Sequence, residues 1–295
     1  MTTSSPIPAA QPILEPVPDH ARYMEFVLRP DADPVPVLRA LAGLGDPALL
    51  VGLGAGLVAG LGAVIEGLHG FRALSGPGVN VPATQADVLC RLHGSDRGDI
   101  AGRARHLRAL LAPAFEPVRQ TDAFRHRDGR DLSGYEDGTE NPEGEEALRT
   151  ALIGSGPLAG SGFVTVQKWR HDLDHFETLP QQLRDHIIGR RLSDNAELDD
   201  APASAHVKRT AQESFSPEAF MLRRSMPWAD AEGEGLMFTA FAASLYPFEV
   251  QMARMSGLDD GITDGLFRFS RPLGGAHYWC PPRVGAGLDL RALGL

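Results

Sequence analysis

The interpretation of this chain turns on residues 134–142, which read GYEDGTENP. Gly134, Gly138 and Pro142 interrupt regular structure, and an Asn-Pro pair favours a turn, so the stretch is predicted to be a loop. Glycines on both sides of an acid let the backbone approach a ligand closely and aim one carboxylate, that of Asp137, at it. An acidic surface turn is the alternative, and the rest of the chain has to decide between the two.

The size and composition of the chain restrict its class. Of 295 residues, 43% are hydrophobic and 22% are charged, as in a globular protein with enough apolar side chains for one large domain or two ordinary ones. The net charge of −10 argues against nucleic acid as a partner. The two cysteines, Cys90 and Cys280, match no CxxC pattern and cannot form a disulfide framework. A reducing compartment, the cytoplasm, is therefore expected.

Two segments bear on targeting and membranes. Residues 1–20 lack the basic region and the continuous apolar stretch of a secretion signal. Residues 48–65 carry no charge, but their five glycines, their minimal length and the missing basic or aromatic flanks argue against a membrane span. The same segment begins like a dinucleotide-binding GxGxxG motif at Gly52, yet Leu57 stands at the third glycine position. A buried strand that runs into a glycine-rich turn is expected instead.

The first part of the chain alternates strand and helix patterns in the order β-α-β-β-α-β, which is typical of a ferredoxin-like fold. Asp96 is predicted to cap the second helix. The predicted elements are strands at 22–29, 48–53, 87–92 and 115–127, and helices at 35–44 and 96–111.

The same order is repeated after residue 142. The predicted elements there are strands at 162–169, 219–224, 236–243 and 266–270, and helices at 178–189 and 247–257. We therefore predict two halves, residues 1–130 and 131–295. Residues 194–205 form a long irregular connection between elements, and such loops are often functional.

One histidine stands out by its surroundings. Small residues precede His206 in the segment PASAHVKR, and they would permit the close approach of a flat cofactor. The basic pair Lys208 and Arg209 follows it. Imidazole is a frequent metal ligand, although a lone histidine is more often a surface residue or a satisfied core residue.

Two adjacent arginines lie inside an apolar strand pattern, in MLRRSMPW. Alternation along a strand sends Arg223 and Arg224 to opposite faces, so that one points inward while the other stays solvated. Ser225 falls on the face of Arg223.

Together these motifs resemble the dye-decolorising peroxidases, haem enzymes in which the aspartate of a GxxDG loop lies above the iron. The chain is identified as a member of the compact bacterial intracellular branch of that family. The resemblance covers nearly the whole chain, through QPILEPVPDHARYMEF, the strand after Gln85, the GxxDG loop, GFVTVQKWRHDL, IIGRR, AHVKRT, RRSMPW and LMFTAF.

The resemblance implies an α+β fold of two ferredoxin-like halves with antiparallel sheets, haem b as cofactor, and a haem pocket in the C-terminal half. It implies that His206 is the axial iron ligand and that Arg209 binds the haem propionates. Asp264 is the expected acceptor for the other ring nitrogen of His206, since a proximal aspartate occurs at a comparable place in relatives. A turn aspartate is the alternative for Asp264.

The resemblance also assigns the opposite face of the haem. Asp137 is expected to move the proton of hydrogen peroxide, and Arg223 to stabilise the departing negative charge. Ser225, where some relatives carry asparagine, is a third candidate for peroxide activation. The implied activity is the oxidation of dyes, phenols or other small reducing substrates by hydrogen peroxide through a ferryl intermediate. An aspartate base with a pKa near ~4 must be ionised to work, which predicts an acidic optimum.

Two other functions are alternatives to a peroxidase. A haem-binding or haem-handling protein would need His206 but neither Asp137 nor Arg223, and a cofactor-free, dimeric ferredoxin-like module would need none of them. The spacing of His171 and His175 permits zinc only if both lie on one helix, and the HExxH glutamate is missing.

Partners follow from the resemblance only in outline. They are hydrogen peroxide and small reductants, with no nucleic acid and no membrane, and a homo-oligomer is expected. Some relatives enter encapsulin shells through a C-terminal extension that is longer than the apolar tail 284–295. Six aromatic residues could relay oxidising equivalents from the haem to the surface, and packing is the alternative role for each. They are Trp169, Trp228, Trp279, Tyr135, Tyr246 and Tyr278.

Overall fold

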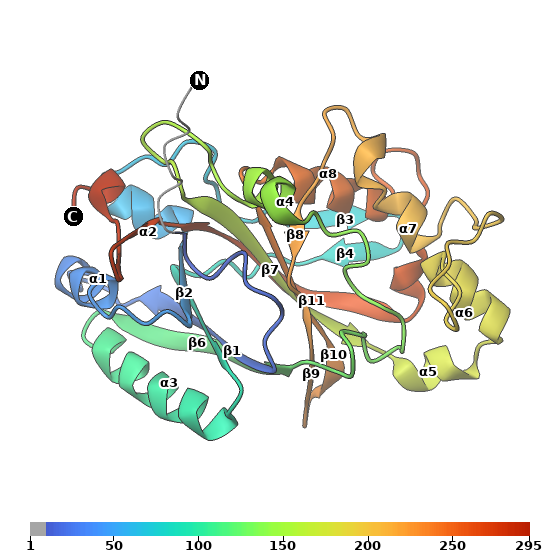
Figure 1. Ribbon diagram of the computed structural model, residues 1–295, viewed down its shortest axis with the longest axis horizontal. Coiled ribbons are helices and arrows are strands. Elements are labelled where there is room, and N and C mark those ends of the chain that lie inside the picture. The colour runs from blue at the N-terminus through green and yellow to red at the C-terminus, as the bar shows by residue number, and fades with distance from the viewer. Residues whose placement is uncertain (1–9) are drawn as a thin grey trace.

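The computed structural model describes residues 10–295 (Figure 1). Its first strands form one half of a sheet, in the order β6-β1-β5-β2, with antiparallel neighbours throughout. Asp96 caps α3 as predicted, because its side chain accepts from the Asp99 N–H, and the helix ends at Leu111 as predicted. The elements of this half are β1 (His20–Leu28), α1 (Val35–Ala42), β2 (Leu49–Leu53), β5 (Val88–Gly94), α3 (Arg97–Leu111) and β6 (Phe115–Phe124).

The later strands form the other half of the same sheet, in the order β11-β7-β10-β8. In both halves the fourth strand of the β-α-β-β-α-β unit lies beside the first, and the third lies between first and second. The predicted α+β fold with duplicated ferredoxin-like halves is therefore confirmed. The elements are β7 (Gly162–His171), α5 (Leu173–Thr178), α6 (Gln181–Ile188), β8 (Leu222–Arg223), β9 (Met226–Asp230), β10 (Gly233–Ala242), α8 (Tyr246–Met255) and β11 (Ser270–Cys280).

The two half-sheets meet where β2 lies beside β11. Only Leu53 and Trp279 pair there in strand register. The side chain of Gln11 supplies further bonds across this seam. It accepts from the Val51 N–H at 2.6 Å and donates to the carbonyls of Val51 and Pro281 at 2.9 and 2.8 Å.

Gln85 makes a similar connection further along β11. Its Oε1 accepts from the His277 and Phe71 N–H groups at 3.0 Å, and its Nε2 donates to the His277 carbonyl at 2.8 Å. Because one sheet runs through both parts of the chain, the division into residues 1–130 and 131–295 stays a prediction.

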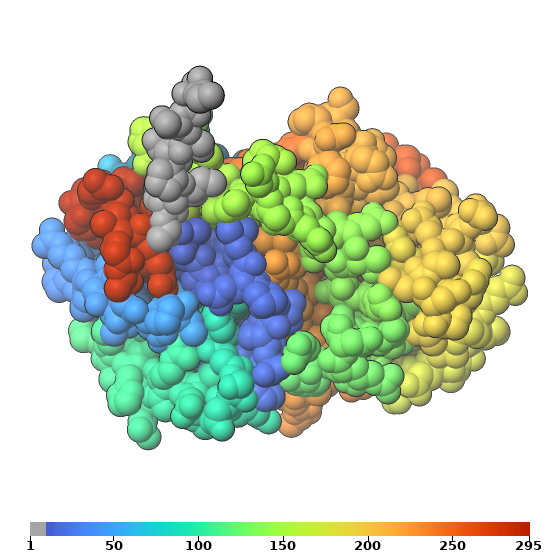
Figure 2. All heavy atoms as spheres, viewed as in Figure 1, coloured from blue at the N-terminus to red at the C-terminus, as the bar shows by residue number. Residues whose placement is uncertain are grey.

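The two faces of the sheet are covered differently. On one face, α1 and α3 pack over the N-terminal half through residues such as Leu107, and α8 packs over the C-terminal half through Phe248 and Met252. On the other face, the N-terminal segment and α4 (Gly144–Ala151) cover an apolar core around Ile13 and Trp228. In the space-filling view this blue segment meets the green residues that follow β6 (Figure 2).

Shorter elements complete the fold. They are α2 (Ala55–Gly60), the hairpin of β3 (Leu74–Gly76) and β4 (Val79–Val81), α7 (His206–Arg209), the 3-10 helices Gln212–Ser214, Gly265–Arg268 and Arg291–Leu293, and the hairpin of β12 (Arg283–Val284) and β13 (Gly287–Leu288).

Three predictions of local structure were wrong. The glycine-rich turn after β2 is the short helix α2, because Gly54 lies in an extended conformation and the chain turns helical after it. Residues 266–270 are mostly a 3-10 helix that begins after Asp264, and the following strand β11 is much longer than predicted. Of the predicted strand 219–224, only Leu222 and Arg223 form a strand, β8, and β9 continues its pairing with β10 in the same register.

Among residues 10–295, no helix is long and apolar enough to cross a membrane. The predicted lack of a secretion signal concerns residues 1–20, and residues 1–9 of these lie outside the described part of the chain.

Candidate active site

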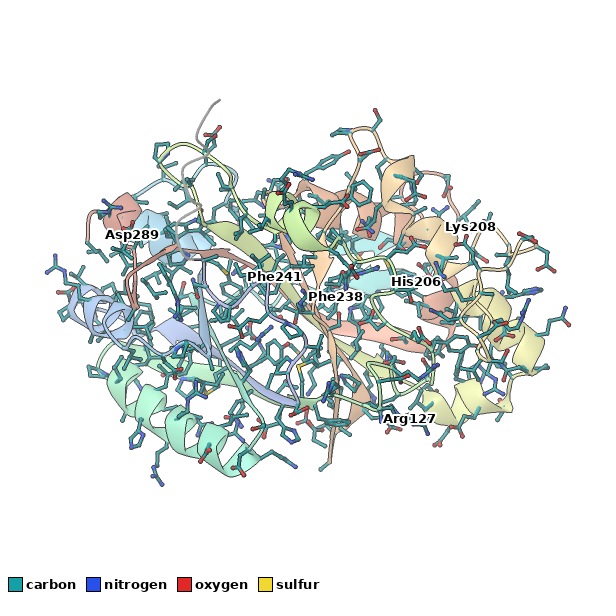
Figure 3. The ribbon with its side chains drawn as sticks, in the orientation of Figure 1. Arg127, His206, Lys208, Phe238, Phe241 and Asp289 are labelled. Atoms are coloured by element: carbon teal, nitrogen blue, oxygen red, sulfur yellow. The ribbon has the colours of Figure 1, made fainter. Side chains whose placement is uncertain are left out.

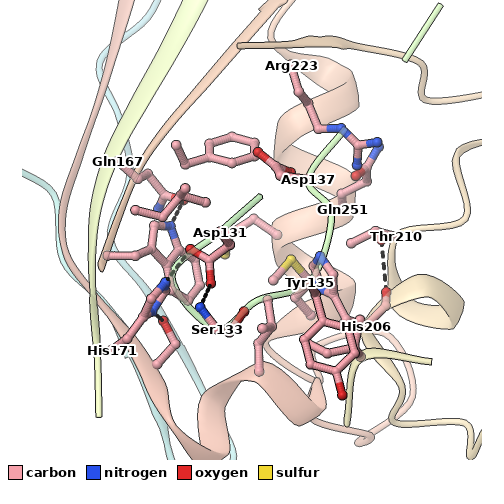
Figure 4. Close-up of a pocket in the computed structure, with 18 of the residues that line it drawn as sticks. Asp131, Ser133, Tyr135, Asp137, Gln167, His171, His206, Thr210, Arg223 and Gln251 are labelled. Carbon is pink, nitrogen blue, oxygen red and sulfur yellow. Dashed lines mark hydrogen bonds and ion pairs between the residues drawn. The ribbon is translucent and has the colours of Figure 1, made fainter. Parts of the chain in front are cut away.

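A cavity of about 130 Å³ lies on the face of the C-terminal half-sheet that α8 covers (Figure 4). Figure 4 shows Asp137 and Arg223 on one side of the cavity, His206 on another, and Asp131 with His171 on a third. Most of the remaining lining is apolar, including Trp169, Leu236, Phe238, Phe248, Met252 and Phe269.

His206 is the first residue of the short helix α7 and lines the cavity. Its Nδ1 lies 2.8 Å from Oδ2 of Asp264, whose side chain is fully buried. The other carboxylate oxygen of Asp264 accepts from the Leu266 N–H at 2.8 Å and so caps the 3-10 helix. The sequence left two alternatives for Asp264, a turn residue or a partner of His206. The two oxygens of its carboxylate serve one function each. Along residues 10–295 no hydrogen bond engages Nε2 of His206, which leaves that nitrogen free to bind a ligand.

The segment around His206 also separates inward from outward side chains. Figure 3 shows His206 directed to the interior and Lys208 at the surface, where it pairs with Glu197 at 3.4 Å. Gly265 allows α7 to come close, because a Cβ at this position would lie 3.1 Å from the Ser204 carbonyl.

Arg209 does not reach the cavity, and its predicted role as a propionate partner is corrected. Its guanidinium is buried and donates to both carboxylate oxygens of Asp260, at 2.8 and 2.7 Å, and to the Arg254 carbonyl at 2.7 Å. The bonds from Arg209 lower the pKa of Asp260 to about 2. Residues three apart on a helix, such as His206 and Arg209, start from the same face. The direction of the Arg209 side chain is instead decided by Asp260 and the Arg254 carbonyl, which hold its guanidinium.

The loop that carries Asp137 is closed by its own backbone bonds. Arg130 and Glu136 form an antiparallel bridge, and Asp137 N–H donates to the Gly129 carbonyl at 3.4 Å. Gly138 has a φ of 73°, which favours glycine, and a Cβ there would lie 2.6 Å from the Asn141 side chain. The loop therefore holds Asp137 at the cavity by its backbone path.

Asp137 is an exposed residue whose surface opens onto the cavity, and protein atoms surround this space closely enough to desolvate its carboxyl. Burial raises its pKa above the ordinary aspartate value, and the charge of Asp131 acts in the same direction. The charges of Arg223 and His206 and the N–H of Gly138 oppose this rise. A raised pKa lets one carboxyl both accept and return a proton near the working pH.

Arg223 and Arg224 leave their strand on opposite faces. Arg223 lines the cavity, and within the described residues its guanidinium has no acceptor; its buried Nε is unsatisfied. Arg224 is not freely solvated as predicted, because it is half-buried and donates to the Glu15 and Leu14 carbonyls at 2.6 and 3.3 Å. Arg223 is thus the arginine available to a ligand.

Ser225 faces a second, more polar cavity that adjoins the first. Asp137 and Arg223 line both cavities, so all three predicted peroxide-activating residues line the second one. The Ser225 Oγ accepts from the Thr239 N–H at a long 3.4 Å, which leaves the hydroxyl able to donate elsewhere.

Sequence reasoning missed several polar residues of the site. Asn141 binds the backbone of Arg223, and Asp131, His171 and Ser270 form a hydrogen-bonded chain in the cavity wall. The Asn141 of the GYEDGTENP loop and the histidine of the WRHDL segment were visible in the sequence, but nothing there showed what they contact.

The zinc alternative for His171 and His175 is not supported by their positions. His171 ends β7, whereas His175 lies on α5 and is exposed. Among residues 10–295, no three side chains of the metal-ligating types are grouped to hold an ion. Of the proposed relay aromatics, Trp169 and Tyr135 line the cavity, and Trp228 donates to the Trp169 carbonyl at 2.9 Å.

Comparison with known proteins gives a consistent result. The family model described as Dyp-type peroxidase, C-terminal, matches residues 128–285. The dye-decolorizing peroxidase of Mycobacterium tuberculosis is 34% identical over 223 residues, which are 72% of this chain and 66% of that relative, just under two thirds of its length.

Solved structures match over nearly the full chain. A variant of DypB from Rhodococcus jostii RHA1, in complex with heme, has a TM-score of 0.86 and 29% identity, covering 95% of this chain and 99% of its own. The encapsulated DyP-type peroxidase from Mycobacterium smegmatis has a TM-score of 0.80 and 28% identity, covering 93% and 96%.

Proposed function

We propose that this chain, which belongs to the Dyp-type peroxidase family and to the compact branch that includes DypB, is a haem peroxidase. Its substrates are hydrogen peroxide and dyes, phenols or other small reductants. One observation carries the proposal: a single cavity contains a histidine backed by a buried carboxylate, an arginine without an acceptor, and a second carboxyl with a raised pKa.

The cavity fits haem b in chemistry. His206 offers Nε2 while Asp264 holds Nδ1, an arrangement that fixes the tautomer and makes the imidazole a stronger ligand. The apolar and aromatic lining suits a porphyrin, and His206, rather than Arg209, is the residue of α7 that reaches it. Bound there, haem supplies an iron centre that reacts with peroxide and passes oxidising equivalents to the reductant.

The residues on the opposite side handle protons and charge. In its ionised form Asp137 accepts a proton from peroxide and, as an acid, returns it to the departing oxygen. Arg223 donates hydrogen bonds to the negative charge that develops on that oxygen, and it needs no rearrangement because its guanidinium has no competing acceptor among residues 10–295. Ser225 orders a water molecule at the boundary of the two cavities.

The raised pKa of Asp137 sets the pH dependence. A carboxyl that must be ionised to act as a base loses activity as the pH falls through its pKa. Since burial raises this pKa, the acid limb of the activity profile lies above the ordinary aspartate range rather than within it.

A test begins with the absorption spectrum of the full chain after haem is added, before and after one equivalent of hydrogen peroxide. The proposal predicts a haem band with histidine ligation and a rapid spectral change that a reducing dye reverses. Tight haem binding without any response to peroxide would favour a haem-handling protein. No haem binding would favour a cofactor-free module.

We propose further that the chain acts in the cytoplasm as a homo-oligomer, which sedimentation of the purified protein would test. The M. smegmatis neighbour is described as encapsulated, and the same assembly remains a hypothesis for this chain. Its apolar C-terminal tail has a structural role, because Leu290 and Leu293 are buried in the core of the N-terminal half. Co-expression with an encapsulin shell protein, followed by co-sedimentation, would decide this point.

A further inference from the structure

A chain of three hydrogen-bonded side chains lies in the cavity wall, outside the residues assigned above. Oγ of Ser270 lies 2.7 Å from Nδ1 of His171, and Nε2 of His171 lies 3.1 Å from Oδ1 of Asp131. The Ser133 N–H donates to the other oxygen of Asp131 at 2.8 Å. His171 and Ser270 are buried, and the side chain of Asp131 is nearly so. Both ring nitrogens of the histidine are engaged, which fixes its orientation.

The same loop carries Asp131 and Asp137. The Asp131 N–H donates to the Tyr135 carbonyl, and the Gly134 N–H donates back to the Asp131 carbonyl, both at 2.9 Å. These bonds fold the loop so that both carboxylates line the cavity and the adjoining polar cavity. Two acids are thus held beside the same space by one short, internally bonded loop.

We propose that Asp131, anchored by His171 and Ser270, is a positioning residue that holds a fixed charge in the cavity wall and thereby sets the proton occupancy of Asp137. The inference deepens the proposed peroxidase function and rests on it for its biological meaning. It concerns the chain's own residues and can be tested without turnover.

The surroundings of Asp131 and Asp137 shift the pKa values of the two carboxyls in opposite directions. Burial opposes the ionisation of Asp131, but the bond to His171 and its charge, together with Ser133, outweigh this effect, and the pKa of Asp131 is lowered. Burial raises the pKa of Asp137, and the charge of Asp131 adds to the rise. Two carboxyls pushed in opposite directions divide into a permanent anion and a proton carrier.

Other charged groups lie near Asp137 on the neighbouring elements. Arg223 from β8 and His206 from α7 favour its ionised form. In the polar cavity, Arg130 pairs with Glu136 at 2.8 Å and with Asp128 at 3.2 Å. Arg125 pairs with Asp19, and His126 completes the set. Asp131 is therefore the acid of this wall whose partner, His171, comes from β7 and not from the loop of Asp137.

The experiment is a carboxyl titration of the full-length, haem-free chain by carbon-13 NMR with labelled aspartate. The Asp137→Asn variant identifies the Asp137 signal by its disappearance. In Asp131→Asn, removal of the neighbouring negative charge should lower the titration midpoint of Asp137 by about one pH unit. In His171→Gln, the midpoint of Asp131 itself should rise, because its carboxylate loses the histidine charge.

Matched variants separate a charge effect from a packing effect. Glu136→Gln removes an acid from the same loop and cavities, but one paired with Arg130, and should move Asp137 by no more than about 0.3 unit. Asp131→Glu restores the charge and should restore the midpoint. If Asp131→Asn does not fold, Ser270→Ala leaves both charges in place and should keep the Asp137 midpoint near the parent value while loosening His171.

Two results would overturn the inference. One is an Asp137 midpoint in folded Asp131→Asn that moves no further than in Glu136→Gln. The other is an Asp131 midpoint that His171→Gln leaves unchanged. Both readouts are independent of peroxide chemistry, so a failed peroxidase assay would leave them standing, and their failure would leave the peroxidase proposal intact.

Discussion

Asn141 holds the backbone of Arg223 from both sides. Its Oδ1 accepts from the Arg223 N–H at 2.8 Å, and its Nδ2 donates to the Arg223 carbonyl at 3.1 Å. Asn141 belongs to the loop of Asp137, so one side chain ties the proposed proton carrier to the proposed charge-stabilising arginine. Gly138 leaves the space that this contact needs.

Asn141→Ala should therefore lower both stability and peroxide reactivity. Loss of the two bonds leaves the Arg223 N–H without its acceptor, whereas the Arg223 carbonyl keeps the bond that Arg224 Nη1 donates at 3.0 Å. An unsatisfied buried donor costs about 1–3 kcal/mol. Chemical denaturation measures the first effect, and stopped-flow mixing of the haem-loaded protein with peroxide measures the second. Asn80→Ala, at an exposed asparagine of β4, is the control. Parent-like peroxide kinetics in Asn141→Ala would show that Arg223 keeps its place without this contact.

His206→Ala should abolish or greatly weaken haem retention, because the other imidazole of the cavity, that of His171, has both ring nitrogens engaged. The ratio of haem to protein after gel filtration, with the ferric spectrum, measures this. His175→Ala, at an exposed histidine, should bind haem like the parent. Unchanged haem content and spectrum in His206→Ala would eliminate it as the axial ligand.

Arg223→Leu and Arg224→Leu should separate reaction rate from stability. Removal of one preorganised donor typically costs about 2.7–4 kcal/mol of barrier, so Arg223→Leu should slow the first step with peroxide by about 10²–10³. Arg224→Leu should leave that rate nearly unchanged but release the segment that contains Leu14 and Glu15, which lowers the melting temperature. The opposite ranking of the two rates would mean that the wrong arginine has been assigned.

Asp137→Asn should slow the peroxide reaction by roughly 10²–10⁴, the usual range for a general acid–base group. It should also stabilise the haem-free chain, and the sign follows from the raised pKa. Below the pKa that Asp137 has in the unfolded chain, the folded and unfolded states both hold the proton. Above that pKa the unfolded chain ionises first, so the parent loses stability as the pH rises towards the pKa of the folded state. The gain in melting temperature should accordingly be larger at pH 7 than at pH 3. A rate within threefold of the parent would transfer the central role to Arg223.

Asp264→Asn should raise the ferric/ferrous potential of the haem-loaded protein. A carboxylate that accepts from a ligating imidazole makes it more electron-rich and favours the ferric state, whereas an amide does so less. Spectroelectrochemical titration measures the shift, with Asp260→Asn as a control because that acid pairs with Arg209 away from the cavity. A potential equal to that of the parent would remove Asp264 from this role.

The sequence predicted the strand and helix order because each element carries its own hydrophobic period, as in β1 and α3. It selected Asp137, His206 and Arg223 through local motifs, and all three line one cavity. It did not place Arg209, whose direction depends on Asp260 in the turn after α8. It also did not place the Asp131–His171–Ser270 chain, which joins a loop to β7 and β11. Side-chain partners that lie far apart in the sequence are decided by tertiary packing, to which local patterns do not respond.

The glutamines at the seam between the half-sheets have a consequence for hydrogen exchange. The Val51 N–H donates to the side chain of Gln11, and the His277 N–H to that of Gln85, residues 40 and 192 positions away. Amide protons bonded within a strand ladder exchange with solvent when that ladder opens. These two can also exchange when a distant side chain leaves while the strand stays folded. Their protection factors therefore report the docking of the N-terminal segment and of the residues before β5 onto the sheet, even while β2 and β11 remain folded.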